Sequence, residues 1–186
     1  MINRAEGVSL RPINRCHMEM LRQWRNDPLI WRWCRQNDLI SDIQQERWFE
    51  KQAFDPTIKM YLIQADDGAL GNPFVGVCGL TDINLWNRRA EFSLYVIPEF
   101  QGKGLAKAAL RTLCWHGFRN LGLNTIWGET FDGNPAAKMF EELWFQKEGT
   151  RKQFYFRNGK FIDAHLYSLS REAYEEHEQH RIGSLE

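Results

Sequence analysis

The sequence has little that would place it in a membrane, in a secretory route or on a nucleic acid. Among its 186 residues, no run approaches the roughly 18 consecutive apolar residues that a membrane-spanning helix needs. The first residues also lack the apolar stretch of a secretory signal peptide. The 24 Lys and Arg are matched by 24 Asp and Glu, so no basic field favours a phosphate backbone. We therefore expect a cytoplasmic protein that binds neither membranes nor nucleic acids.

Cysteine and histidine are also scarce, and neither is arranged for cross-linking or for metal binding. The four cysteines are widely spaced and include no CxxC pair, which favours reduced thiols over a disulfide framework. The five histidines show no spacing typical of metal ligands. We expect no metal site.

Aromatic residues are abundant by contrast, with eight Trp and twelve Phe. A hydrophobic fraction of 43% and a charged fraction of 26% exclude wholesale disorder. The length predicts one domain with a substantial core, which we place at residues 1–172, followed by a charged tail at 173–186 that we expect to be helical or frayed. The aromatic excess is consistent with either an unusual core or an aromatic-lined pocket.

Hydrophobic periodicity predicts the order of the secondary-structure elements. Alternating residues predict strands at 8–13, 59–65, 74–81, 90–97, 124–130, 152–157 and 160–168. Helical spacing predicts helices near 18–24, 41–53, 104–118 and 134–143, with a break at Pro28. Ser41 and Gln44 form a capping-box pattern, Asp66-Asp67-Gly68 predicts a turn, and Asn158-Gly159 predicts a hairpin. The expected fold class is α/β, with a mixed sheet of about seven strands flanked by helices.

A glycine-containing loop lies between the strand at 90–97 and the helix that follows it. Its sequence is Gln101-Gly102-Lys103-Gly104-Leu105-Ala106. Backbone N–H groups at the start of a helix lack intrahelical partners and lie at its positive end, so such a loop suits a phosphate or pyrophosphate. It lacks the third glycine of the dinucleotide-binding fingerprint and the GxxxxGK[ST] pattern of nucleoside-triphosphate loops.

The pattern Gln101-x-x-Gly104-x-Ala106 resembles the Q/R-x-x-G-x-G/A acyl-CoA loop of the GNAT N-acetyltransferases, whose element order is similar to the one above. The resemblance implies acetyl-CoA as the cofactor and a slot between two diverging strands. It implies that the loop amides, from residues Gln101, Gly102, Lys103, Gly104, Leu105 and Ala106, hold the pyrophosphate. It also implies that the pantetheine arm pairs with Tyr95, Val96 and Ile97.

A second, weaker resemblance covers residues 134–145. It implies that Asn134 bonds the pantetheine, and that Phe140 stands where many members have a tyrosine that protonates the departing CoA thiolate. Phenylalanine has no proton to give, so the thiolate leaves unaided, or water or another hydroxyl serves. Trp144 replaces the glycine that would end the helix in a left-handed conformation, so we expect that helix to close differently. These departures leave a catalytically silent acyl-CoA-binding module as an alternative.

The reaction needs a base, because an ammonium must lose a proton before it attacks the thioester. Glu91, near the start of the strand before the loop, is the first candidate, and Glu129 on the following strand is the second. The alternative for Glu91 is a solvated glutamate at a strand end. No cysteine lies in the CoA strand or loop, which favours direct transfer in a ternary complex over an acyl-enzyme.

The region at 8–57 is expected to form the acceptor side, and the region at 58–170 the CoA-binding core and C-terminal hairpin. Trp24, Arg25, Asn26 and Trp31 are the candidate acceptor-binding residues, although Trp24 is equally consistent with plain core. They resemble a branch with ribosomal-protein-alanine acetyltransferase-like enzymes and aminosugar-nucleotide acetyltransferases of the pseudaminic acid pathway. That implies a small amine acceptor, a nucleotide-linked amino sugar ahead of a peptide N-terminus, in a monomer or homodimer. Trp33 and Trp48 also lie in the acceptor-side region, whereas the remaining four tryptophans, Trp86, Trp115, Trp127 and Trp144, are expected to pack in the core.

Overall fold

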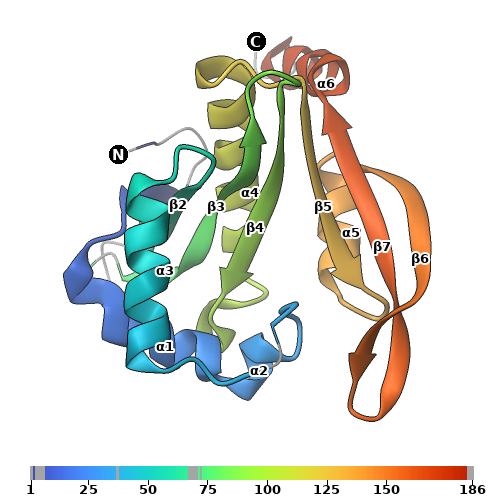
Figure 1. Cartoon of the computed structure of the whole chain (residues 1–186). Coiled ribbons are helices and arrows are strands. Elements are labelled where there is room, and N and C mark those ends of the chain that lie inside the picture. Colours follow the sequence, from blue (N-terminus) through green and yellow to red (C-terminus); the bar gives the residue numbers. More distant parts are fainter. Residues whose placement is uncertain (1, 3–6, 37, 67–70, 72, 184–186) are drawn as a thin grey trace.

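The chain folds around one seven-stranded sheet, seen in a computed structural model that describes residues 2, 7–36, 38–66, 71 and 73–183 (Figure 1). The strand order is β1-β2-β3-β4-β5-β7-β6, and every neighbouring pair is antiparallel except β4 and β5. The strands are β1 (Val8–Pro12), β2 (Lys59–Ala65), β3 (Phe74–Asn84), β4 (Arg89–Val96), β5 (Thr125–Phe131), β6 (Gln146–Arg157) and β7 (Lys160–Ser170). The predicted mixed α/β sheet is confirmed.

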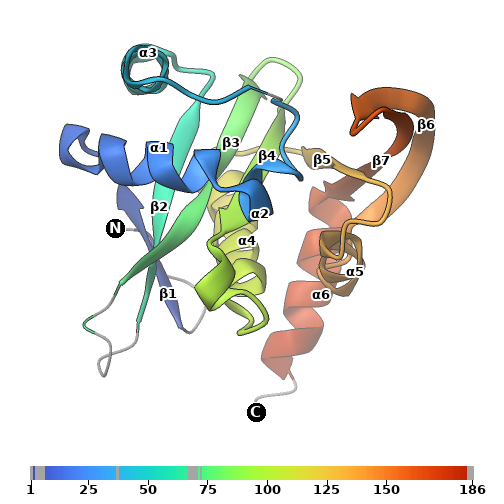
Figure 2. The same ribbon diagram turned by 90° about the horizontal axis from the view of Figure 1, so that it is seen from below.

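Helices cover both faces of the sheet (Figure 2). One face carries α1 (Met18–Asn26), α2 (Pro28–Trp31) and α3 (Asp42–Phe54), and the other carries α4 (Leu105–Trp115), α5 (Ala136–Glu142) and α6 (Arg171–Gly183). The short helices are η1 (Arg15–His17), η3 (Pro98–Phe100) and the π-helical η4 (His116–Asn120). Pro28 opens α2 at its first turn, where a missing N–H costs nothing, and thereby separates α2 from α1. The predicted capping box of Ser41 and Gln44 is present.

The core has two parts, and one of the tryptophans predicted to lie in the core, Trp86, lies outside both of them. The larger cluster fills the space between the sheet and α4, and the smaller one lies beneath α1 and α3. Trp24 and Trp48 are partly buried and pack against the smaller cluster, which favours the core alternative for Trp24. Trp86 is 93% exposed, and its predicted place in the core is wrong because the turn between β3 and β4 carries it beyond the sheet.

Strands β4 and β5 pair over only three residues and then diverge (Figure 1). The paired residues are Arg89 with Thr125, Ala90 with Ile126 and Glu91 with Trp127. Just beyond them the Phe92 ring lies against Gly128, where any side chain on residue 128 would collide with it. The ring therefore occupies the space between the strands where their pairing ends. The predicted slot between two diverging strands is confirmed.

The C-terminal region is more ordered than the sequence pattern indicates. β6 begins at Gln146, six residues before the predicted strand. The prediction missed this first half because its residues are polar and its register with β7 shifts twice, which removes the alternating pattern. The tail after residue 172, for which a helix or a frayed end was expected, is helix α6, whose Tyr174 is 2% exposed and stacks on Phe118. The Asn158-Gly159 hairpin is confirmed, with positive φ at both residues. Most of the predicted Asp66-Asp67-Gly68 turn lies outside the described residues.

The end of α5 corrects a prediction. Because Trp144 stands in place of a glycine, we expected the helix to end without a left-handed residue. Trp144 nevertheless adopts the left-handed conformation, with φ of 67°. Its N–H donates to the Glu141 carbonyl at 3.0 Å, as in a helix that ends on glycine. A side chain in this region costs about 1–3 kcal/mol. The indole stacks on the His177 ring of α6, 4.6 Å away and 8° from parallel, and this contact offsets the strain.

Candidate active site

The divergence of β4 and β5 opens a cleft of about 700 Å³. Its wall includes the segment after α2, the outer half of β4, the loop before α4, the end of β5 and the start of α5. The predicted site residues in this wall are Arg25, Tyr95, Val96, Gln101, Gly102, Gly104, Leu105, Ala106, Glu129, Asn134 and Phe140. The predicted site residues outside the wall are Trp24, Asn26, Trp31, Glu91, Ile97 and Lys103.

The loop before α4 is shaped to receive an anion. Gly102 and Gly104 have φ of 75° and 78°, and Gly104 is the N-cap of α4. A Cβ on either glycine would meet no atom within 4 Å, so the backbone at both positions faces open space. The Gln101 side-chain amide donates to the Val96 carbonyl at 2.8 Å and fixes the loop to the end of β4. The Lys103 ammonium lies over the Phe100 ring rather than in the cleft wall.

Thr130 contributes an unsatisfied polar group to the cleft that sequence reasoning missed. The residue is 5% exposed, and its hydroxyl has no hydrogen-bond partner among the described residues. Buried hydroxyls are almost always bonded, so this one points to a ligand group in the cleft. No pattern in the sequence distinguishes it from any other strand threonine.

Asn134 and Phe140 line the cleft from the β5–α5 side. The Asn134 side-chain oxygen accepts from the Ala136 N–H at 3.0 Å, so its amide group is the donor left to face the cleft. Phe140 is 5% exposed and packs edge-on against Phe92 and Tyr167, at centroid distances of 5.0 and 5.5 Å. Phe140 therefore belongs both to the wall of the cleft and to the larger core cluster.

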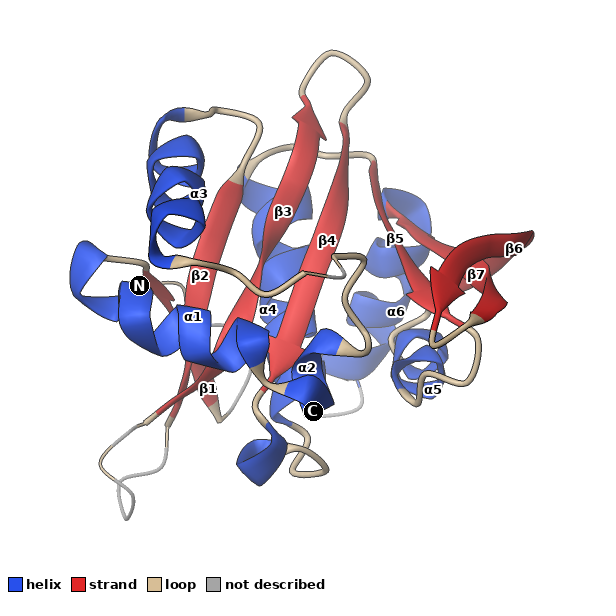
Figure 3. Cartoon of the chain, turned by 60° about the horizontal axis from the view of Figure 1, so that its bottom comes forward, coloured by secondary structure: helices blue, strands red, loops and turns tan. Residues whose placement is uncertain are grey.

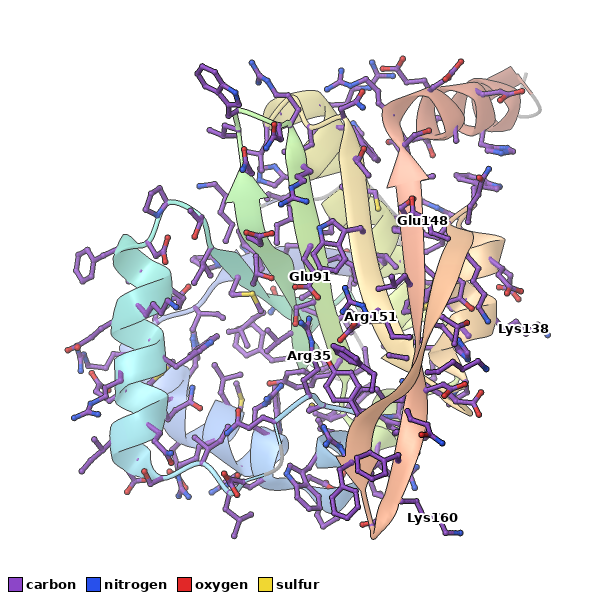
Figure 4. All side chains as sticks on the ribbon, turned by 45° about the vertical axis from the view of Figure 1, so that its right-hand side comes forward. Arg35, Glu91, Lys138, Glu148, Arg151 and Lys160 are labelled. Atoms are coloured by element: carbon purple, nitrogen blue, oxygen red, sulfur yellow. The ribbon has the colours of Figure 1, made fainter. Side chains whose placement is uncertain are left out.

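Two carboxylates and two guanidinium groups meet at the inner end of the slot (Figure 4). We call this the acid cluster, and it consists of Glu91, Glu129, Arg35, Arg151 and Tyr155. Arg35 donates to Glu91, and its Nε lies 3.6 Å from Glu129 Oε1. Glu129 also accepts from Arg151 Nη1 at 3.1 Å and from the Tyr155 phenol. The structure brings the two predicted base candidates together, with an arginine that the sequence analysis did not select.

Burial controls the proton affinity of this cluster. Burial raises the pKa of Glu91, which is 6% exposed, while the Arg35 guanidinium opposes the shift and the Glu129 charge adds to it. Burial and the hydrogen bond to Glu129 raise the pKa of Tyr155 to about 12, so its phenol stays protonated and donates. Glu91 thus holds a proton more tightly than an ordinary glutamate, as suits a base working near neutral pH.

Two of the predicted acceptor residues have clear structural roles. Asn26 bonds both backbone groups of Ile40, at 2.8 and 2.9 Å, and so anchors the segment that follows α2. Arg25 lies over the Tyr95 ring and donates to Gln36 at 3.3 Å. Trp31 does not line the cleft.

The segment after α2 crosses in front of the gap between β4 and β5 (Figure 3). It supplies Trp33, Cys34 and Arg35 to the cleft wall. Arg157, at the tip of the β6–β7 hairpin, donates to the carbonyls of Cys34 and Arg35 at 2.9 and 2.6 Å. Its guanidinium also lies over the Phe131 ring. Parts of the chain more than 120 residues apart therefore meet at the mouth of the cleft.

A sheet that opens between two parallel strands, with an anion-binding loop beside the opening, defines the class of acyl-CoA N-acyltransferases. The profile of the acetyltransferase (GNAT) domain matches residues 8–142, well over half of the chain. The chain belongs to the GNAT acetyltransferase family. It is therefore an N-acetyltransferase that uses acetyl-CoA. The open backbone of the loop at Gly102 and Gly104 and the unpaired Thr130 hydroxyl fit that cofactor.

Relatives with named activities differ in their acceptors. The spermidine N(1)-acetyltransferase of Escherichia coli K12 is 27% identical over 161 residues, which cover 86% of this chain and 84% of that one. A Bacillus subtilis protein provisionally named a ribosomal N-acetyltransferase is 32% identical over 110 residues, 59% of this chain and 58% of that one. The solved structure of Vibrio cholerae spermidine N-acetyltransferase with CoA and spermine superposes with a TM-score of 0.84 at 24% identity. It covers 91% of this chain and 98% of that one, and this likeness supports the fold alone.

Two further properties concern the described part of the chain only. Within those residues, no helix combines the length and apolar character that a bilayer crossing requires. The same residues hold no group of three or more His, Cys, Asp and Glu arranged to bind a metal ion. Cys16, Cys34, Cys78 and Cys114 are all unpaired.

Replacing Thr130 by valine tests whether its hydroxyl serves the cofactor. We expect Thr130→Val to weaken acetyl-CoA binding about fivefold, the value of one neutral hydrogen bond, without loss of thermal stability. Calorimetric titration and a melting curve measure the two effects. Thr112→Val is the matched control, because Thr112 is equally buried but bonds the Ala108 carbonyl within α4. Equal acetyl-CoA affinity in both variants would assign the Thr130 hydroxyl no role in binding.

Proposed function

We propose that this enzyme transfers the acetyl group of acetyl-CoA to the primary amine of a small cationic acceptor, by direct attack in a ternary complex. The observation that carries the proposal is the pair Glu91 and Glu129 at the inner end of the slot, since the two carboxylates bind the Arg35 guanidinium from the cleft side and so form a site for a cation there. Cys34 is the cysteine in the cleft wall, and burial raises the pKa of its thiol, which disfavours it as a nucleophile.

Each part of the cleft has a distinct task in this proposal. When bound, acetyl-CoA supplies an activated thioester. The amides of the loop at 101–106 hold its pyrophosphate, beside the positive end of α4. The free edge of β4 at Tyr95 and Val96, extended by Ile97, and the polar groups of Asn134 and Thr130 hold the pantetheine arm.

Glu91 is the proposed base. Its carboxylate takes a proton from the acceptor ammonium, directly or through one water, and the amine that results attacks the thioester carbonyl. Glu129 holds Arg35, Arg151 and Tyr155 around the same point and lies in the cleft wall. The departing thiolate has no tyrosine at residue 140, but a thiol with a pKa of about 8.5 is an adequate leaving group at neutral pH.

Adding a hydroxyl at residue 140 tests whether the leaving group needs a proton. We expect Phe140→Tyr to leave kcat within about threefold at pH 8, because a thiolate whose conjugate thiol has a pKa of about 8.5 can leave without first being protonated. Steady-state kinetics with the best acceptor measure the change, and a melting curve checks that the ring still packs against Phe92 and Tyr167. A tenfold rise in kcat would instead show that protonation of the thiolate limits turnover.

Among acceptors, we rank a flexible polyamine-like amine first. The carboxylate pair supports it, and several relatives carry spermidine in their names. A nucleotide-linked amino sugar comes second, since Trp24 and Asn26, which carry that resemblance, lie outside the cleft wall. A peptide N-terminus comes third, supported by the relative with a ribosomal name. We also propose a cytoplasmic location, a monomeric or homodimeric state and a single domain at residues 1–172.

A thiol assay for CoA release tests the proposal. The purified protein is mixed with acetyl-CoA and, separately, with spermidine, a nucleotide-linked amino sugar and a peptide that begins with alanine. We expect turnover with spermidine. Normal acetyl-CoA binding without release from any acceptor would favour the catalytically silent module. Failure to bind acetyl-CoA in a calorimetric titration would overturn the proposal.

A further inference from the structure

The position of Arg35 in the acid cluster is unusual for a structural ion pair. Its side chain is 49% exposed and forms part of the cleft wall, while the Glu91 side chain that it bonds is 8% exposed and does not line the cleft. Arg35 therefore lies between Glu91 and the cleft. Among the described residues, it is the cation that bonds Glu91, whereas Glu129 has Arg151 as well.

A guanidinium and a protonated amine make the same kind of contact with a carboxylate. Both carry a positive charge, and both donate N–H groups at similar distances. An ammonium that reached Glu91 would occupy the place of the Arg35 guanidinium. The four charged groups of the cluster sum to zero with Arg35 in place, so an added cation would meet no net attraction until Arg35 left.

We infer that Arg35 occupies the ammonium subsite of this enzyme, and that a cationic acceptor binds by displacing its side chain from Glu91 and Glu129. This inference rests on the proposed function, because it assumes that the acceptor is an amine. It makes Arg35 a specificity-determining residue. It also gives the acceptor class as amines that are protonated when they arrive.

The surroundings allow the side chain to leave while its backbone stays. Arg157 holds the Cys34 and Arg35 carbonyls, and Asn26 anchors Ile40 at the end of the same segment. The Arg35 side chain is half exposed, so its guanidinium can move into water, where its charge is hydrated. The Glu91 carboxylate is buried, however, and leaving it unpaired is costly. Displacement is therefore favourable only when another cation takes the place of Arg35, which a neutral acceptor does not do.

Removal of the side chain tests the inference directly. With Arg35→Ala we expect the KM for spermidine to fall about fivefold with kcat within twofold, because the acceptor no longer competes with a resident group. Spermidine binding to the CoA-saturated protein should tighten by the same factor in a calorimetric titration. Arg35→Lys, which keeps the charge but contacts the two carboxylates with a single ammonium group, should give a KM for spermidine between those of the parent protein and Arg35→Ala. Arg119→Ala is the matched control, because Arg119 is 50% exposed and paired with Glu175 but lies outside the cleft wall.

Guanidinium chloride at low millimolar concentration separates this role from the alternative. If Arg35 is the resident occupant, free guanidinium competes with spermidine in Arg35→Ala and has little effect on the parent protein. If Arg35 instead positions Glu91, Arg35→Ala loses kcat and free guanidinium restores it, which overturns the inference. Equal spermidine affinity in the two proteins also overturns it. Should no acceptor be acetylated by the parent protein, the proposed function fails, while the binding titration still reports on Arg35.

Discussion

Glu91→Gln is expected to lower kcat by about 100-fold or more, the usual contribution of a positioned general base. Glutamine keeps the size and hydrogen-bonding capacity of the side chain but accepts no proton at neutral pH. Acetyl-CoA affinity should not change, because Glu91 does not line the cleft. Glu129→Gln is the matched variant, and we expect a smaller loss from it because Arg151 and Tyr155 hold that carboxylate. Stopped-assay kinetics and calorimetry give both parameters.

The dependence of kcat/KM on pH identifies the base independently of how far kcat falls in Glu91→Gln. Three charged groups act on Glu91, with Arg35 lowering its pKa and Glu129 and Asp82 raising it, and burial makes the net shift upward. A base works when deprotonated, so kcat/KM should fall as the pH drops through this raised pKa. The acidic limb should disappear in Glu91→Gln. An unchanged limb in that variant would assign the base to another group.

Phe92→Ala is expected to cost about 3–5 kcal/mol in the free energy of unfolding, as large-to-small changes of buried aromatic residues do. The Phe92 ring packs edge-on against Phe140 and Phe145 and fills the space against Gly128. Its removal leaves a cavity where β4 and β5 separate, so acetyl-CoA binding should also weaken. Urea unfolding and calorimetric titration measure the two effects.

Phe54→Ala is the control for that change. Phe54 is 86% exposed at the end of α3, so its truncation should alter stability by less than about 0.5 kcal/mol. Equal effects of the two substitutions would show that the Phe92 ring does not support the split between the strands.

Local patterns predicted most elements, because alternation, capping and turn signals act between residues close in the chain. The hairpin at Asn158-Gly159, the capping box at Ser41 and the loop before α4 all follow from such signals. The first half of β6 did not, since its polar residues and two register shifts remove the alternation. The expectation for Trp144 was wrong because its left-handed backbone is stabilised by stacking of the indole on His177 of α6, more than 30 residues later in the chain.

The candidate site was predicted in part for the same reason. The anion-binding loop is contiguous, so its residues could be recognised together. Arg35 and Glu91 are 56 residues apart, and Arg157 bonds a carbonyl 123 residues away, so no periodicity links them. The acceptor residues Trp24 and Trp31 were chosen for their aromatic rings, but neither lines the cleft, and Trp24 packs instead against the smaller core cluster.

The short pairing of β4 with β5 has a mechanical consequence. Strands β1 to β4 and strands β5 to β7 form two halves of the sheet, and three residue pairs are the whole of the β4–β5 ladder. The two halves of the sheet are therefore joined by only a short ladder beside the cleft. A ligand that contacts both strands bridges the halves, and its binding free energy adds to the work needed to separate them. We therefore expect acetyl-CoA bound in the cleft to raise the free energy of unfolding of the whole sheet.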